Sequence, residues 1–260
     1  MRHALLGLAA LLCCAPALHA QTADELIARY VKTVGGTERI GAAKTLRRVG
    51  KFTGGGGFEA EVVQENKRGG LVRQEFSLQG MTAVTAYDGK VGWKIDPFGG
   101  KKDAEALSEE EMHGILVDAD FDEPLINYRE KGGKAEFIGM DQFEGTDVYK
   151  VRVTLRNGDM RVYWLDADSY VPIRVDDKRM IRGTEQVVET TLGDYKPVNG
   201  WYLPFSMESG LKGQDKSKIT LARIDANVPL DDARFAKPPQ AAATPASDPP
   251  LAPKPIPEED

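Results

Sequence analysis

The chain has 260 residues, of which 41% are hydrophobic and 28% charged, with a mean hydropathy of -0.38. These values are typical of a globular protein and exclude a polytopic membrane protein, a collagen-like repeat and a chain disordered throughout. The 40 acidic residues outnumber the 34 basic ones, giving a net charge of -6. This balance argues against a nucleic-acid-binding protein, because phosphate contacts need a basic face.

Residues 1–20 have the features of a secretory signal. Arg2 gives the positive start, residues 5–12 are apolar, and residues 18–20 form a cleavage site. The apolar stretch is too short to span a bilayer, so we expect no stable membrane insertion. Cleavage removes both cysteines, Cys13 and Cys14, and no small residue precedes them as lipid attachment would require. We therefore expect an exported, soluble protein of the periplasm.

Residues 237–260 hold eight of the fifteen prolines, with alanine and acidic residues between them. This composition lacks the apolar residues needed to offset the entropy of ordering, so it predicts an extended, disordered tail. The tail is either a solubilising spacer or a segment that reaches a partner. Residues 21–236 then form one folded domain.

The folded domain is predicted to begin with helices. Thr22 and Glu25 have the spacing of a capping box, and apolar residues recur on one helical face from there to Gly35-Gly36. A shorter helix is expected from Thr37 to Ala43. The apolar period then changes to two, which indicates strands for most of the remaining domain.

Turn dipeptides such as Asp88-Gly89, Asn157-Gly158 and Asn199-Gly200 divide this region at short intervals. They supply the positive φ angles of tight hairpins, and the spacers are too short for crossover helices. We therefore predict a mainly β (α+β) fold, with about ten antiparallel strands curved into an incomplete barrel. Few helices are available to cover its apolar face, so either a pocket remains or the interior is fully packed. The residues expected to share that face include Val72, Phe76, Trp93, Val151, Val153, Val162, Trp164, Trp201, Leu203, Phe205 and Met207.

A third helix is predicted from Ser108 to about Val117, because Ser108 can cap it and three glutamates follow. The helix lies within residues 99–128, which we regard either as a lid or as a plain connection. The apolar residues assigned to the lid are Met112, Ile115, Leu116 and Phe121.

Seven segments together resemble the periplasmic outer-membrane lipoprotein-sorting proteins, relatives of the LolA and LolB carriers. The resemblance covers nearly all of residues 22–236, and it depends on the order of hairpins rather than on a chemical motif. It implies an incomplete antiparallel barrel wrapped around lid helices, with lipid tails held in the hollow. The segments are TADELIARYVKTVGGTERI (22–40), AYDGKVGWKIDPFGG (86–100), SEEEMHGIL (108–116), ADFDEPLINYREKG (119–132), the run FEGTD to PIRV (143–175), LGDYKPVNGWYLPFSM (192–207) and NVPLDDARF (227–235).

The resemblance implies an acylated lipoprotein or lipid as ligand, membrane partner proteins on either side of the periplasm, and a monomer. Exposure to water costs about 0.8 kcal/mol for each methylene, or about 12 kcal/mol for a chain of sixteen carbons, and a carrier must shield the chain from it. Methionines suit such a wall because they repack around variable tails, although core packing is the more usual explanation for any single one. The predicted cavity residues are Phe76, Met81, Trp93, Trp164, Trp201, Phe205 and Met207.

Enzymatic interpretations have little support in the sequence. His113 is the only histidine after cleavage, and no nucleophile or orienting partner is indicated for it. The acidic run at 118–122 departs from a calcium loop, because Glu123 occupies the glycine position and Arg129 the glutamate position. We therefore expect no enzyme, cofactor or metal. The alternative to a carrier is a structural or interaction protein of the envelope with a packed interior.

Overall fold

The computed structural model describes residues 21–181 and 183–239, so the predicted signal and most of the predicted tail lie outside the described residues. The described chain forms two compact units that alternate along the sequence. Unit 1 contains residues 21–42 and 122–218, and unit 2 contains residues 43–121 and 219–239. Each unit is therefore described by itself.

Thirteen strands form one sheet in the order β6-β5-β4-β3-β2-β1-β13-β12-β11-β10-β9-β8-β7. In the described part of the chain, the two end strands of this order do not pair with each other, so the sheet is open rather than a closed barrel. The predicted fold class, an antiparallel incomplete barrel with a few helices, is confirmed. The strand number is thirteen rather than about ten, partly because β6 (Lys101–Ala106) lies in the segment assigned to a lid loop.

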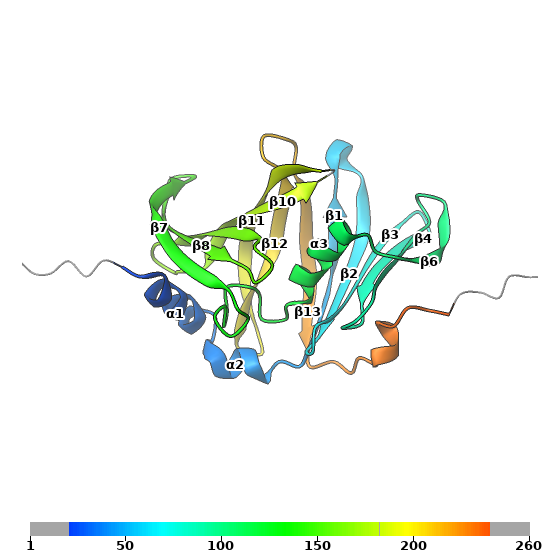
Figure 1. The fold of residues 1–260 in the computed structure, drawn as a ribbon, viewed down its shortest axis with the longest axis horizontal. Helices are drawn as coiled ribbons and strands as arrows, with labels where there is room; N and C mark the ends of the chain where they lie inside the picture. Colours follow the sequence, from blue (N-terminus) through cyan, green and yellow to red (C-terminus); the bar gives the residue numbers. More distant parts are fainter. Residues whose placement is uncertain (1–20, 182, 240–260) are drawn as a thin grey trace, which may run out of the picture. The chain divides into compact units, whose positions relative to one another are not determined.

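Unit 1 begins with two helices. Thr22 caps the first one through the predicted capping box: its Oγ1 accepts from the Glu25 amide at 3.2 Å, and Glu25 Oε2 accepts from the Thr22 amide at 3.0 Å. The helix lies beside β7 (Figure 1) and buries Leu26, Ile27 and Tyr30. The elements of unit 1 are α1 (Ala23–Thr33), α2 (Gly36–Ala42), β7 (Lys134–Phe143), β8 (Thr146–Thr154), β9 (Met160–Asp166), β10 (Pro172–Ile181), β11 (Thr184–Val198) and β12 (Trp201–Leu211).

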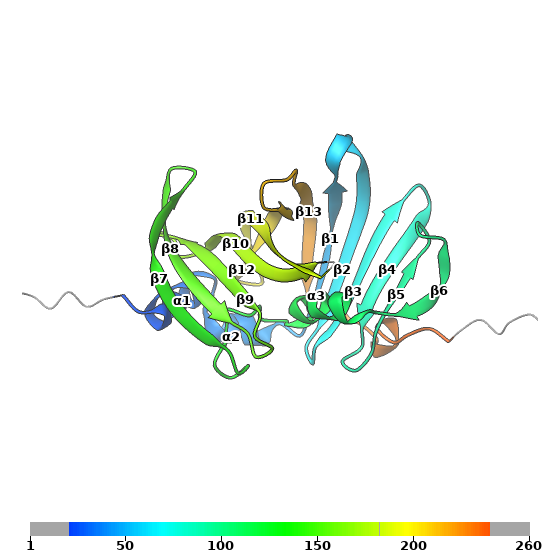
Figure 2. The same cartoon turned by 45° about the horizontal axis from the view of Figure 1, so that its top comes forward.

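Unit 2 combines six consecutive strands, one helix and the last strand of the chain. The helix begins at Ser108, whose Oγ accepts from the Glu111 amide at 3.2 Å, and it crosses the strands on one side of the sheet (Figures 1 and 2). The elements of unit 2 are β1 (Thr45–Thr53), η1 (Gly55–Gly57), β2 (Glu59–Lys67), β3 (Leu71–Leu78), β4 (Met81–Tyr87), β5 (Gly92–Asp96), β6, α3 (Glu109–Ala119), β13 (Ser217–Ala226) and η2 (Asp232–Arg234).

The strand register of unit 2 defines two faces of its sheet. Residues directly opposite each other on paired strands share a face, and neighbours along a strand point to opposite faces. Val72 pairs with Asn66 and Tyr87, and α3 packs on this side, which we call the α3 face. Glu65, Arg73, Ala86 and Trp93 lie on the other side. We call it the strap face, because the segment Val228–Phe235, here named the strap, crosses it.

None of the helices in residues 21–181 and 183–239 combines the length and apolar character needed to cross a membrane.

Candidate functional site

The α3 face of unit 2 ends in an apolar area that α3 does not cover. α3 lies over the rows of the sheet that contain Val72 and Gln74. Beyond them, Phe76 is opposite Val62 and Ala83, and the next row on this face includes Phe52 and Met81. Alternation along β1, β3 and β4 therefore directs these side chains to one surface.

Aromatic rings connect three hairpin ends on this surface. The Phe52 ring lies 5.6 Å from that of Phe58 and 5.3 Å from that of Phe76, and Phe76 lies 5.9 Å from Phe98 (centroid distances). Phe58 lies in the β1–β2 connection, directly after η1, and Phe98 lies in the β5–β6 turn. We call Phe52, Phe58, Phe76, Met81 and Phe98 the aromatic patch.

The aromatic patch is exposed to a degree unusual for large apolar side chains. Phe58 is 45%, Phe98 42% and Met81 41% exposed, while Phe52 and Phe76 are partly buried beneath them. Burying such rings is strongly favourable, and a contiguous apolar area on a protein surface indicates a binding site. The patch is therefore the candidate site for an apolar ligand.

α3 is held on the sheet by a small apolar contact with polar contacts at its two ends. Ile115 and Ala119 pack on Val72, with Met112, Leu107 and Tyr87 at the edge of this cluster. At the helix start, Lys94 Nζ lies 2.5 Å from Glu111 Oε1. At the helix end, the Asp118 carbonyl oxygen accepts from Asn66 Nδ2 at 2.7 Å, and Asp118 Oδ2 accepts from Gln74 Nε2 at 3.0 Å.

The Lys94–Glu111 pair changes the titration of both groups. Partial burial of Glu111 opposes ionisation, but hydrogen bonds from Lys94 and Ser108 hold the pKa of Glu111 below its ordinary value of 4.5. The hydrogen bond with Glu111 raises the pKa of Lys94 against its own desolvation. Both groups are charged near neutral pH, so the pair fixes the start of α3 on β5.

The four predicted lid residues have different positions in unit 2. Ile115 is buried against the sheet and Met112 lies at the edge of the same cluster, whereas Leu116 is 44% exposed. Phe121 is buried, and the Arg68 guanidinium lies 4.6 Å from its ring centroid. Only part of the predicted lid segment is helical, because residues 101–106 form edge strand β6.

Two predicted cavity residues of unit 2, Phe76 and Met81, belong to the aromatic patch. Trp93 does not: it pairs with Ala86, which lies on the strap face. The expectation that Phe76 and Trp93 share a face was wrong. The register between β4 and β5 decides the face of Trp93, and it cannot be obtained from alternation within β5 alone.

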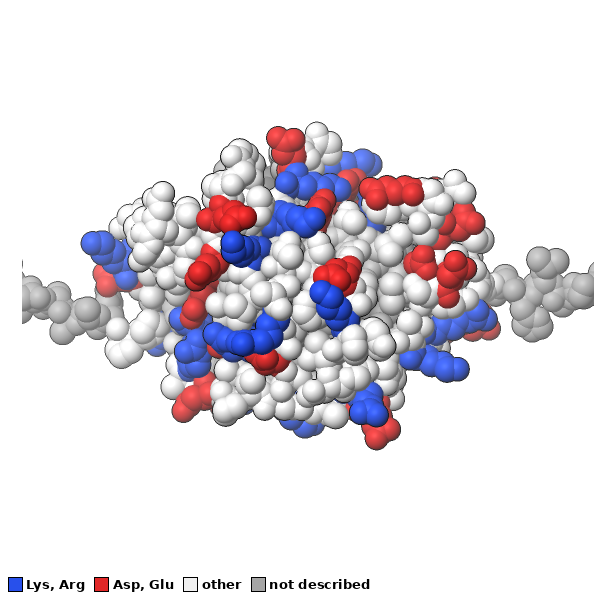
Figure 3. Space-filling model, turned by 180° about the vertical axis from the view of Figure 1, so that it is seen from behind, with Lys and Arg blue, Asp and Glu red and all other residues white. Residues whose placement is uncertain are grey.

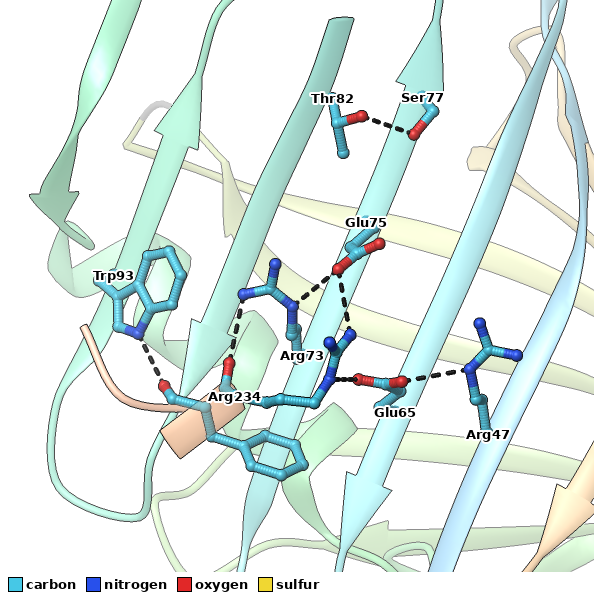
Figure 4. A network of polar contacts seen from close by, with 9 residues as sticks. Arg47, Glu65, Arg73, Glu75, Ser77, Thr82, Trp93 and Arg234 are labelled. Carbon is cyan, nitrogen blue, oxygen red and sulfur yellow. Dashed lines mark hydrogen bonds and ion pairs between the residues drawn. The ribbon is translucent and has the colours of Figure 1, made fainter. Parts of the chain in front are cut away.

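Trp93 instead holds the C-terminal strap. Its indole nitrogen donates to the Phe235 carbonyl oxygen at 2.8 Å, and the Phe235 ring is fully buried. Arg234 extends this contact, because its Nε lies 2.7 Å from Glu65 Oε2 and its Nη2 3.4 Å from Glu75 Oε1. Figure 4 shows Trp93, Glu65, Glu75 and Arg234 together on this face of the sheet.

Further contacts make the strap a continuous polar network (Figure 4). Arg73 Nε lies 2.8 Å from Glu75 Oε1, and its Nη1 donates to the Arg234 carbonyl oxygen at 3.2 Å. Lys67 Nζ donates to the Leu230 carbonyl oxygen at 2.9 Å. In the sequence, residues 227–235 contribute only to the family resemblance. Their role was missed because their partners lie more than a hundred residues earlier in the chain.

Unit 1 holds the other four predicted cavity residues on two faces. Trp201, Phe205 and Met207 alternate along one face of β12. Trp164 is opposite Arg174, Arg174 is opposite Thr191, and Thr191 is opposite Glu208, so Trp164 lies on the face opposite to Met207. The expectation that these four residues share a face was wrong for Trp164.

Trp164 has mainly charged neighbours, together with the Phe143 ring at 6.2 Å between centroids. Lys150 and Arg174 lie 4.5 and 4.6 Å from its ring centroid, and its indole nitrogen donates to Asp176 Oδ2 at 3.0 Å. Arg174 in turn pairs with Asp176 and Glu189 at 2.6 Å. The neighbouring Tyr163 and Leu165 are buried on the other face. A run of four apolar residues, Val162–Leu165, leaves the facing ambiguous in sequence.

Unit 1 also buries a polar cluster that the sequence did not indicate. Arg161 pairs with Asp177, with Nη2 3.0 Å from Oδ2, and both side chains are largely buried. Burial, followed by the charge of Glu123, raises the pKa of Tyr30 well above 10. The opposite charges of Arg161 and Asp177 compensate each other inside unit 1.

Metal-binding geometry has no support in the described ranges. No group of three or more His, Cys, Asp or Glu side chains in residues 21–181 and 183–239 could hold a metal ion. On the side of the molecule shown in Figure 3, basic and acidic side chains alternate with uncharged surface. That side therefore shows no large basic area that would favour nucleic acid.

Several solved structures share this fold. A DUF1329 family protein from Desulfovibrio piger is 13% identical with a TM-score of 0.58, and the match covers 84% of this chain and 98% of that one. A domain from Vibrio parahaemolyticus, whose name refers to outer membrane lipoprotein sorting, is 14% identical with a TM-score of 0.57 over 83% and 97%. A LolA superfamily protein from Nitrosomonas europaea is 12% identical with a TM-score of 0.56 over 84% and 99%.

No protein-family model matches the sequence, and the comparison with curated proteins found no match. The structural matches nevertheless span nearly the whole length of the proteins concerned. The resemblance to lipoprotein-sorting proteins is thereby confirmed at the level of the fold: the chain has a LolA-like fold.

Proposed function

We propose that this protein is a periplasmic carrier that binds acyl chains of a lipoprotein or lipid on the aromatic patch and transfers them toward the outer membrane. The observation that carries the proposal is the exposed cluster of Phe58, Met81 and Phe98 beside α3. The names of two proteins with the same fold, which refer to lipoprotein sorting and to the LolA superfamily, support it. The predicted signal at residues 1–20 supports export.

The chemistry of the patch suits a saturated chain. Aromatic rings and a methionine offer large apolar area and few directional bonds, so a chain can bind in several registers and still leave. Exposing a chain of sixteen carbons to water costs about 12 kcal/mol, at about 0.8 kcal/mol per methylene. The protein must bury most of the chain to avoid this cost. The patch alone is small for this, so more apolar surface is needed.

Movement of α3 would supply that surface. The apolar contact under the helix is limited to Val72, Ile115 and Ala119 with a few partly buried neighbours. The ion pair at its start is partly exposed, and such pairs contribute little to stability. In the proposal α3 is a lid: an acyl chain that binds better when Val72 and Tyr87 are uncovered shifts the population toward the open form.

The test compares two aromatic residues of nearly equal exposure. Phe98→Ser removes a ring from the patch, whereas Tyr202→Ser removes a ring that is 43% exposed on β12 of unit 1. We expect Phe98→Ser to weaken binding of a fluorescent C16 fatty acid by about tenfold, in line with the loss of part of one buried aromatic side chain. Tyr202→Ser should bind as the parent does.

Native mass spectrometry of the purified parent protein gives the second measurement. Lipid that is retained by the parent and lost in Phe98→Ser supports a carrier. Equal probe binding by both variants at matched folded fraction, or the absence of fatty-acid binding in the parent, would reject the proposal. The second result would favour an envelope protein that uses the same surface to contact another protein.

A further inference from the structure

The strap and α3 hold the same strands of unit 2 from opposite faces. On β2, Glu65 pairs with Arg234 of the strap at 2.7 Å. The next residue, Asn66, donates to the Asp118 carbonyl oxygen of α3 at 2.7 Å. Two adjacent residues therefore connect β2 to both elements.

β3 repeats this arrangement. Arg73 donates to the Arg234 carbonyl oxygen at 3.2 Å on the strap face. Its two neighbours point the other way: Val72 packs on Ile115, and Gln74 donates to the Asp118 carboxylate at 3.0 Å. Because side chains alternate between the two faces along a strand, each pair of neighbouring residues connects the strap on one face with α3 on the other.

β5 provides the third link. Trp93 donates to the Phe235 carbonyl oxygen at 2.8 Å, and the adjacent Lys94 pairs with Glu111 of α3 at 2.5 Å. Gly92 precedes Trp93 in the sequence and has no side chain. Met112 of α3 fills the space that a Cβ on Gly92 would occupy. Every strand that the strap fixes through these contacts therefore also carries a docking contact of α3.

We propose that the strap regulates the position of α3: docked on the strap face it keeps β2, β3 and β5 spaced for α3, and released it lets α3 leave the sheet. The coupling follows from the links described above, since a shift of any of these strands disturbs both sets of contacts. By linkage it is reciprocal, so loss of α3 contacts also loosens the strap. Its consequence for acyl chains rests on the proposed function, but the coupling itself does not.

Hydrogen exchange of the full chain, read by mass spectrometry, tests the coupling without any ligand. Arg234→Gln removes the ion pairs with Glu65 and Glu75. The matched control is Arg223→Gln, which removes an ion pair with Asp225 at 2.7 Å on β13 of the same unit. We expect amides of α3 to exchange at least about fivefold faster in Arg234→Gln than in the parent, since fivefold is the lower end of the range for coupled sites. In the control they should exchange at the parent rate.

The reciprocal variant is Lys94→Met, which keeps the apolar stem and removes the pair with Glu111. It should accelerate exchange in the strap, where the amides of Arg234 and Phe235 donate to Asp231 and Asp232 at 3.1 and 3.0 Å. If Arg234→Gln fails to fold, Lys67→Met replaces it, because it removes contacts with Leu230 and Asp232 of the strap and leaves the Arg234 pairs in place.

The proposal is overturned if a strap variant exposes the strap while α3 exchanges as in the control. Titration with a C16 fatty acid separates it from the proposed function. Coupled exchange without fatty-acid binding rejects the carrier and leaves the coupling intact. Fatty-acid binding with independent exchange of strap and α3 rejects the coupling alone.

Discussion

Gly92 shows how a single residue fixes α3 on unit 2. A Cβ built on Gly92 would lie 2.3 Å from Met112 Sδ and 2.8 Å from Leu107 Cδ1. Both neighbours are flexible side chains, so they can move, but only by giving up their packing against the α3 face. The glycine therefore permits close approach of the helix to β5.

We predict that Gly92→Ala lowers the free energy of unfolding by about 1–3 kcal/mol, the usual cost of overpacking. It should also increase hydrogen exchange in α3. The control is Gly193→Ala in β11, where no atom lies within 4 Å of the added Cβ. That variant should change stability by less than about 1 kcal/mol and can be slightly stabilising. Equal effects of the two substitutions in urea unfolding would contradict the packing argument.

The face of the sheet on which a single side chain lies is the feature that the sequence predicts least well. The apolar character of Trp93 and Trp164 is plain in the sequence, but the face that each occupies depends on pairing with β4 and β10. In β9 the run Val162–Leu165 is apolar at every position, so alternation gives no preferred face. Phe76 was placed by the period of two in its strand, whereas Met81 was chosen because methionine suits a wall that adapts to different chains.

At the scale of elements, helix ends were the most predictable features. The helix caps at Thr22 and Ser108 are local, and both form as expected. Strand β6 was missed because its sequence, KKDAEA, is charged and lies at the sheet edge, where charged residues prevent edge-to-edge pairing. The strap was missed because it has no regular pairing and depends on distant partners.

The lowered pKa of Glu111 gives a pH dependence to α3. A carboxylate whose pKa is lower in the folded state contributes stability above its unfolded pKa and loses it as the pH falls through the folded pKa. With an ordinary value of 4.5, the contribution should be complete at neutral pH and disappear under acid conditions below 4.5.

Glu111→Gln isolates this charge, because glutamine can still complete the capping box. We expect the parent to be more stable than the variant near neutral pH, and the difference in urea unfolding free energy to shrink steadily in acid. A difference that stays constant at low pH would show that the charge of Glu111 does not stabilise α3.

At the scale of the whole molecule, the proposal depends on apolar contact rather than on net charge. The chain carries a formal charge of -6, and on the side shown in Figure 3 both signs are mixed. The binding free energy of an apolar ligand therefore depends on the apolar area that is buried. This area increases with each methylene until the available protein surface is covered.

We predict that affinity for fatty acids rises by up to about fourfold per methylene from C10 to C16, the equivalent of about 0.8 kcal/mol. The increase should stop once the chain exceeds the patch and the surface under α3. Displacement of a fluorescent probe at low and high salt measures this. Affinity that is independent of chain length, or that falls strongly with salt, would indicate recognition of a charged head group instead.

Unit 2 is assembled from two stretches, 43–121 and 219–239, that are separated in the sequence by the whole sheet of unit 1. During synthesis the nascent chain therefore finishes β1–β6 long before β13 and the strap exist. Until then Glu65, Arg73 and Trp93 have no strap to bind, and β1 lacks its second neighbour. A chain terminated before Ile219 would contain every strand of β7–β12 but only an incomplete unit 2. The sheet of unit 2 thus cannot be completed until residues 219–239 have been synthesised.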